Sequence, residues 1–165
     1  KYFYAGCPNH KVPKNGVKSI TFITGCALFY RPSSAGLLTE KFFFGEEDFE
    51  FSMRLKNHAM QMACVYSSKI IHRVGSSFKK ESNTNLGRYY IHYVSRFIDM
   101  KAFYKPLKWR LVIKLNEAYG LYYLVFQKRI GVSRSLKMRR MIIKDSKKKD
   151  DFSKKDFEQA RRLSF

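Results

Sequence analysis

The spacing of hydrophobic and polar positions changes about halfway along the chain. In the first half, the run SITFITGCALFY (residues 19–30) is β-branched and aromatic with partial alternation, which predicts a strand bent near Gly25. The run RPSSAGLL then predicts a short helix that begins near Pro32 and ends near Gly36. Further on, MACVYSSKIIH predicts two short strands around residues 67–68, followed by a polar, basic loop, RVGSSFKKESNTN.

Between these strand runs, residues 47–59 predict an amphipathic helix. Phe51, Leu55 and Ala59 recur at four-residue spacing, which puts them on one helix face. Acidic residues fill the first turn, where the helix dipole favours negative charge. The order strand, helix, strand predicts an α/β fold for residues 1–85.

The second half has helical spacing throughout. Residues 86–104 carry Tyr90, Val94, Phe97 and Ile98 on one face. After Pro106, residues 107–129 carry apolar side chains at similar spacing: Leu111, Leu115, Ala118, Tyr122 and Val125. A more basic segment covers residues 133–149, and Ser153 is expected to cap a last short helix. We therefore divide the chain into residues 1–85, a basic helical region at 86–149, and a C-terminal helix or tail at 150–165.

Composition and charge add a surface property to this picture. The chain has 165 residues, 45% of them hydrophobic, and a formal net charge of +20, so the charge lies on a folded body. Residues 101–150 alone hold 15 Lys and Arg against 3 acids. The longest uncharged run there, AYGLYYLVFQ, is far shorter than the roughly 20 residues that cross a bilayer. Basic amphipathic helices suit an anionic membrane surface, and they also suit the solvated face of a basic protein; both interpretations stay open.

Composition also bears on the cellular compartment and on nucleic-acid binding. Three cysteines without a CxxC spacing favour free thiols in a reducing compartment, which predicts a cytoplasmic protein. A sequence pI near 10.0 raises nucleic-acid binding as an alternative. However, the chain has no RRM, KH or zinc-finger pattern, and its acidic cluster would repel phosphate. We therefore expect no nucleic-acid partner.

The acidic stretch FFFGEEDFEF (residues 42–51) is unusual in so basic a chain. Helix capping and surface charge are the ordinary explanation for such acids. Alternatively, a carboxylate at a helix start, backed by aromatic side chains, is suited to act as a general base once a substrate hydroxyl comes within hydrogen-bond distance. Residue types alone leave both explanations open.

Four segments, taken in order, resemble the acceptor-side half of a family 2 glycosyltransferase, a sugar-nucleotide-dependent enzyme of the GT-A fold. They are TGCALFYR, TEKFFFGEEDFEFSMRL with its F-x-x-x-E-D-x-D/E-x-x-x-R pattern, KIIHRVGSS with its H-x-x-G-S ending, and the helical GRYYIHYVSRF. Together they cover about half of the chain. The resemblance implies the C-terminal part of a Rossmann-like mixed sheet, followed by α-helices.

The resemblance also implies a reaction and its residues. Asp48 would be the general base, with Glu47 its neighbour, in the transfer of a sugar from a nucleotide-sugar donor to a hydroxyl of a glycan or lipid-linked acceptor, with inversion. Gly25, Cys26 and Arg54 fall at acceptor-side positions. A β-bulge remains the alternative at Gly25, and an ordinary surface ion pair between Glu50 and Arg54 remains the alternative for Arg54.

The same resemblance bears on the donor side. His72 would lie near a divalent metal, Mn²⁺ or Mg²⁺, and the diphosphate, although a lone His is also a common structural residue. Arg73, Ser76 and Ser77 would supply donors to phosphate oxygens, or belong to an ordinary basic loop. Because the sequence contains no Asp-x-Asp, the metal would be held mostly by a nucleotide-binding half outside this chain, and the chain by itself would be inactive.

The location is expected to be cytoplasmic, with peripheral attachment at the inner face of the cell membrane as a refinement. A noncatalytic basic module that binds a membrane surface or nucleic acid is the alternative to an enzyme.

Overall fold

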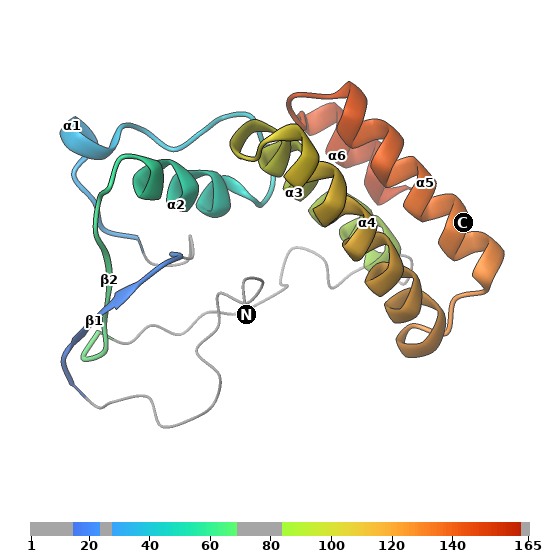
Figure 1. Cartoon of the computed structure of the whole chain (residues 1–165), viewed down its shortest axis with the longest axis horizontal. Helices are drawn as coiled ribbons and strands as arrows, with labels where there is room; N and C mark the ends of the chain where they lie inside the picture. Colours follow the sequence, from blue (N-terminus) through green and yellow to red (C-terminus); the bar gives the residue numbers. More distant parts are fainter. Residues whose placement is uncertain (1–14, 24–27, 69–83, 163–165) are drawn as a thin grey trace. The chain divides into compact units, whose positions relative to one another are not determined.

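The computed structural model describes residues 15–23, 28–68 and 84–162, which form two compact units (Figure 1). The first unit contains residues 15–23, 28–40 and 47–68, with the elements β1 (Val17–Ile20), α1 (Pro32–Ala35), α2 (Glu47–Asn57) and β2 (Met62–Val65). The second unit contains residues 41–46 and 84–162, with α3 (Thr84–Phe103), α4 (Pro106–Tyr122), the π-helical turn η2 (Tyr123–Gln127), α5 (Val132–Lys148) and α6 (Lys154–Arg161).

The predicted α/β fold with a Rossmann-like mixed sheet is wrong. The described residues are mostly helical, and their one sheet pairs β1 with β2 antiparallel, with Val17 opposite Val65 and Ile20 opposite Met62. The apolar run after Ile20 supplied the expectation of a longer strand. In the structure, Leu28 and Tyr30 from that run pack against the core around α2 rather than extending the ladder. The β-branched and aromatic composition of this run is therefore explained by burial against α2 and not by pairing in a strand.

The core of the first unit lies between α2 and the segments that cross it. Its buried apolar residues are Ala35, Phe51, Leu55 and Met62, with Ile20, Ile23, Leu28, Tyr30 and Met60 packed around them. The predicted helix is confirmed with Phe51 and Leu55 on its buried face. It ends earlier than predicted, because Ala59 takes a positive φ of 54° that no helix accommodates.

In the second unit, α3 is the central helix and packs against α4, α5 and α6. The expected α3 face is confirmed: Tyr90, Val94, Phe97 and Ile98 are all buried. Gly87 lets α6 approach closely, since a Cβ at this position would lie 2.6 Å from the carbonyl oxygen of Ala160. At the start of α6, Ser153 and Asp156 form the two reciprocal hydrogen bonds of a capping box, as the predicted cap requires.

Helix α4 buries a different face from the one marked by its leucines. The buried residues are Trp109, Ile113, Gly120 and, in η2, Leu124, and the indole N–H of Trp109 donates to the carbonyl of Phe97 at 3.0 Å. The residues expected from their spacing to share a face point outward instead: Leu111 is 57% exposed, Leu115 63% and Tyr122 52%. Helix α4 has two apolar faces, and the face that carries Gly120 and the indole N–H of Trp109 lies against the core.

One arginine of the basic segment lies inside the second unit. Arg139 of α5 is 1% exposed, and its Nη1 donates to the hydroxyl of Tyr89 at 3.2 Å. Its guanidinium lies over the rings of Tyr93 and Phe97, 5.3 and 5.8 Å from their centroids. Gly120 makes room for it, because a Cβ there would lie 2.8 Å from Cζ of Arg139. Cation–π attraction is strongest where water is excluded, as here.

The segment 41–46 belongs to the helical unit although it precedes α2. Phe42 forms an isolated parallel bridge with Phe152, and the backbone N–H of Phe152 donates to the carbonyl of Lys41 at 2.7 Å. The rings of Phe43 and Phe44 each lie 5.3 Å from the ring of Phe157 on α6. The aromatic run therefore attaches the chain just before the acidic stretch to α6.

Candidate functional site

The acidic stretch contributes to both units and lies where the chain passes from one to the other. Gly45 and Glu46 both take positive φ angles, 77° and 75°, and α2 begins at the next residue, Glu47. Glycine accepts such a conformation readily, whereas for Glu46 it is strained. Strain of this kind persists only where surrounding contacts hold the backbone.

Asp48, the predicted general base, is a half-buried residue in the first turn of α2. Its carbonyl accepts a hydrogen bond from the hydroxyl of Ser52 at 2.7 Å, and the Ser52 oxygen accepts from the backbone N–H of Ile23 at 3.0 Å. The ring of the preceding residue, Phe22, lies 6.0 Å from that of Phe49. These contacts fasten the segment ending at Ile23 to the turn that carries Asp48.

The expected ion pair between Glu50 and Arg54 is present, and it has a wider role than a surface pair. Arg54 Nε lies 3.0 Å from Glu50 Oε1, and Nη2 lies 3.2 Å from Oε2. Its two terminal nitrogens also donate to the carbonyls of Ala35 and Leu37, at 2.6 and 2.7 Å. Gly36, with φ of 72°, passes directly beneath the guanidinium. Arg54 thus ties the end of α1 to α2, while its predicted contact with an acceptor stays a prediction.

Glu46 is a site residue that the sequence analysis missed. Glu46 is 5% exposed, and its carboxylate meets two side chains of α3: His92 Nδ1 lies 2.7 Å from Oε1, and Arg96 Nε donates to Oε2. Burial by itself raises the pKa of this carboxyl, but the hydrogen bond from His92 and the charge of Arg96 outweigh it, so the pKa of Glu46 lies below its ordinary value. The i, i+4 spacing of His92 and Arg96 on one helix face was the available signal.

A partly buried contact between a phenol and a carboxylate joins α3 to α5. The hydroxyl of Tyr90 donates to Asp145, and burial together with this carboxylate raises the pKa of Tyr90 well above its ordinary value. A neutral Tyr90 hydroxyl is the donor in this contact, which joins the two helices.

Several predicted site residues lie outside the described residues, namely Gly25, Cys26, His72, Arg73, Ser76 and Ser77. Within residues 15–23, 28–68 and 84–162, no group of three His, Cys, Asp or Glu side chains is placed to hold a metal ion. The binding of Mn²⁺ or Mg²⁺ stays a prediction.

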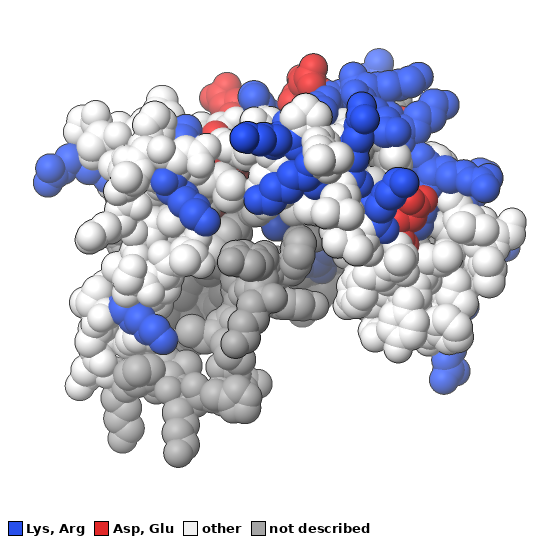
Figure 2. All heavy atoms as spheres, viewed as in Figure 1, with Lys and Arg blue, Asp and Glu red and all other residues white. Residues whose placement is uncertain are grey.

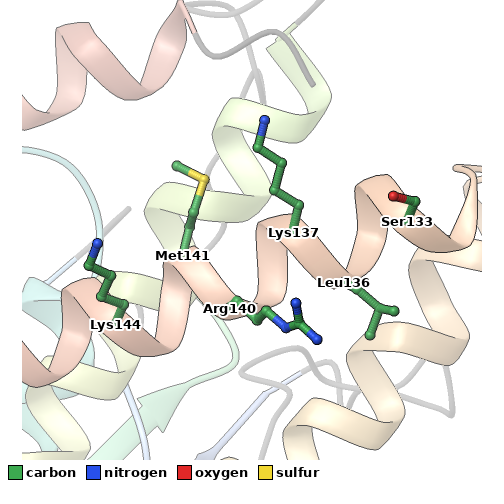
Figure 3. Close-up of a pocket in the computed structure, with 6 residues that line it drawn as sticks. All are labelled: Ser133, Leu136, Lys137, Arg140, Met141 and Lys144. Atoms are coloured by element: carbon green, nitrogen blue, oxygen red, sulfur yellow. The ribbon is translucent and has the colours of Figure 1, made fainter.

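The outer side of α5 carries a shallow basic hollow of about 330 Å³ (Figure 3). Its lining comes from α5 alone: Ser133, Leu136, Lys137, Arg140, Met141 and Lys144. The side chains of Lys137, Arg140 and Lys144 extend from α5 beside the apolar Leu136 and Met141. Arg139 of the same helix is instead buried in the core. The hollow is open and one-sided, with no buried polar group aimed into it.

Comparison with known proteins gives no match: no family model matches the chain, and neither a curated protein nor a solved structure is found to resemble it.

Proposed function

We propose that this chain is the acceptor-side part of a glycosyltransferase that moves a sugar from a nucleotide-sugar donor to a hydroxyl of a glycan or lipid-linked acceptor, with Asp48 as the general base. The proposal starts from the four ordered segments that resemble family 2 glycosyltransferases.

The observation that carries the proposal is the hydrogen-bonded chain from Ile23 through Ser52 to Asp48. Gly25 and Cys26 are the proposed acceptor-side positions, and they follow Ile23 by two and three residues. The segment that ends at Ile23, just before these positions in the sequence, is thus tied to the turn of the proposed base. A general base works only when its carboxylate is held within hydrogen-bond distance of the reacting hydroxyl.

The chemistry assigned to Asp48 is one proton transfer. The acceptor oxygen forms a bond to the anomeric carbon, and the bond from that carbon to the nucleoside diphosphate breaks with its electron pair leaving on the diphosphate. The acceptor proton goes to the Asp48 carboxylate. Attack opposite the leaving group inverts the anomeric configuration. Asp48 is half-buried, which suits a group that must meet a hydroxyl arriving from solvent.

Arg54 has a supporting place in this proposal. Its bonds to Glu50, Ala35 and Leu37 hold α2 against the preceding loop, and a base is effective only if its own backbone is held in place. We infer that Glu50 and Arg54 position the helix that carries Asp48, with no contact to the reacting atoms required.

The test is Asp48→Asn in the full-length protein, assayed with a panel of nucleotide sugars and hydroxyl acceptors. Transfer should fall by about 10²–10⁴-fold, the usual effect of losing a general base, with donor affinity unchanged within about twofold. The matched control is Glu40→Gln, which makes the same acid-to-amide change at an exposed position of the same unit and should leave transfer unaffected. Wild-type turnover in Asp48→Asn would remove Asp48 from the mechanism, and absence of transfer in the wild-type protein across the panel would favour a noncatalytic module.

A further inference from the structure

Helix α4 and the π-helical turn after it expose a continuous apolar stripe. Its members are large side chains spaced three or four residues apart, and each is more than half exposed: Leu107 at 80%, Leu111 at 57%, Leu115 at 63%, Tyr119 at 52%, Tyr122 at 52% and Phe126 at 69%. This spacing follows the helical repeat, so the six side chains share one face. At 1.5 Å of rise per residue, the stripe is about 28 Å long.

The stripe is not part of the core of the second unit. The opposite face of the same helix, with Trp109, Ile113 and Gly120, makes the contacts with α3 and α5. A soluble helix with one buried face normally presents polar residues on the other. Exposed apolar surface that is this long and continuous marks an interaction site.

The charges around the stripe indicate what it contacts. Lys108, Arg110 and Lys114 are exposed on α4, the exposed Lys105 precedes it, and Lys128 and Arg129 follow η2. Figure 2 shows Lys and Arg gathered over the helices of the second unit, with uncharged surface where α4 runs into η2. The single acid of α4 is Glu117. Apolar and aromatic side chains bordered by cations are typical of a helix that lies in the interface of an anionic bilayer, where Tyr rings and Lys stems reach toward the headgroups.

We propose that this stripe docks the protein on a membrane surface rich in anionic phospholipid, with α4 parallel to the bilayer plane. No helix among the described residues is long and apolar enough to cross a membrane, so α4 lies on the surface rather than across it. A second copy of the chain is a poorer occupant, because it would bring another formal charge of +20 against the same basic helices. The proposal is independent of the glycosyltransferase assignment, which concerns the other unit.

The experiment is vesicle flotation of the full-length protein, with phosphatidylglycerol in phosphatidylcholine as the anionic surface and phosphatidylcholine alone as the neutral one. The variant is the double change Leu111→Asp and Leu115→Asp, which alters exposed side chains only. The matched control is Leu37→Asp, the same chemical change at a 75% exposed position of the first unit. Circular dichroism of each protein establishes that it remains folded.

Wild type and the Leu37→Asp control should float with anionic vesicles and not with neutral ones, and binding should weaken as salt rises from about 0.1 M to about 0.5 M. The double variant should bind on the order of 100-fold more weakly, since it loses two apolar contacts and adds two repelled charges. Equal flotation of the double variant and wild type would overturn the proposal. So would equal binding to neutral vesicles, or a lipid-free dimer in analytical ultracentrifugation that the double change dissociates, which would assign the stripe to a second copy.

Discussion

Replacing Glu46 by Gln tests whether this buried carboxylate holds the chain before α2 onto α3. Gln retains the shape of the side chain and one carbonyl acceptor, and it removes the charge that His92 and Arg96 face. Gln also keeps the conformational strain of the 75° φ angle at this position. A glycine would relieve that strain and add a second effect to the comparison. The measured difference therefore reports the loss of the negative charge and of one of the two acceptor oxygens.

The magnitude follows from the exposure of the partners. Arg96 is only 14% exposed in its side chain, so its hydrogen bond to a charged acceptor should be worth about 2 kcal/mol. His92 is 51% exposed, and solvent screening limits its part to about 0.5 kcal/mol. We expect Glu46→Gln to lower the free energy of unfolding by about 2–3 kcal/mol at neutral pH.

Urea unfolding followed by circular dichroism measures this change. The control is Glu158→Gln, which removes a carboxylate from an exposed i, i+3 pair with Arg161 at 3.6 Å and should cost under about 0.5 kcal/mol. The effect should also depend on pH. Because the folded pKa of Glu46 is below its ordinary value of 4.5, its stabilisation is complete above that value and is lost as pH falls through the folded pKa.

The difference between wild type and Glu46→Gln should therefore shrink as the pH falls below about 5. A difference no larger than that of Glu158→Gln would refute the anchoring role. A difference that grew as the pH fell below about 5 would refute the sign of the pKa shift of Glu46.

Three other changes have definite expected outcomes. Gly120→Ala should destabilise the fold by about 1–3 kcal/mol in thermal or urea unfolding, because the new Cβ meets Arg139. In a helix with free space the same change stabilises. The control is Gly131→Ala, where a new Cβ meets open space. Arg54→Lys should cost about 1–2 kcal/mol in the same assay, since an ammonium cannot reach a carboxylate and two carbonyls at once. Ser153→Ala should cost about 1 kcal/mol by removing the cap of α6, and equal stability would show that the cap contributes nothing.

Local signals predicted the helices well. Pro32 and Pro106 stand at the first positions of α1 and α4, and Ser153 caps α6, so each start was readable from one residue. The buried face of α3 followed from periodicity because its other face is polar. These features depend on residues close together in the sequence, and pattern analysis captures them.

Features that depend on distant partners were not predictable. Helix α4 has two apolar faces, and periodicity cannot tell which one meets α3; the contact of Trp109 with Phe97 decides it. The mixed sheet was expected from a resemblance and from the apolar run after Ile20. A sheet requires partner strands, however, and among the described residues β2 is the strand that pairs with β1.

The candidate site was predicted in part. The sequence located Asp48 in a first helical turn and Glu50 beside Arg54, because both depend on local spacing. It did not locate Glu46, whose partners lie about 50 residues away on α3, nor the backbone link from Ile23 to Ser52. Long-range contacts of this kind are fixed by the packing of whole elements.

We proposed that Asp48 assists a single displacement at an anomeric carbon, and the configuration of the product is the decisive measurement. Proton NMR of the glycoside formed by the full-length protein, recorded before any anomerisation, reports this configuration from the coupling of the anomeric proton. We expect a configuration opposite to that of the donor. A product with the donor's configuration would rule out the proposed single displacement, because retention requires a mechanism in which one general base and one displacement are insufficient.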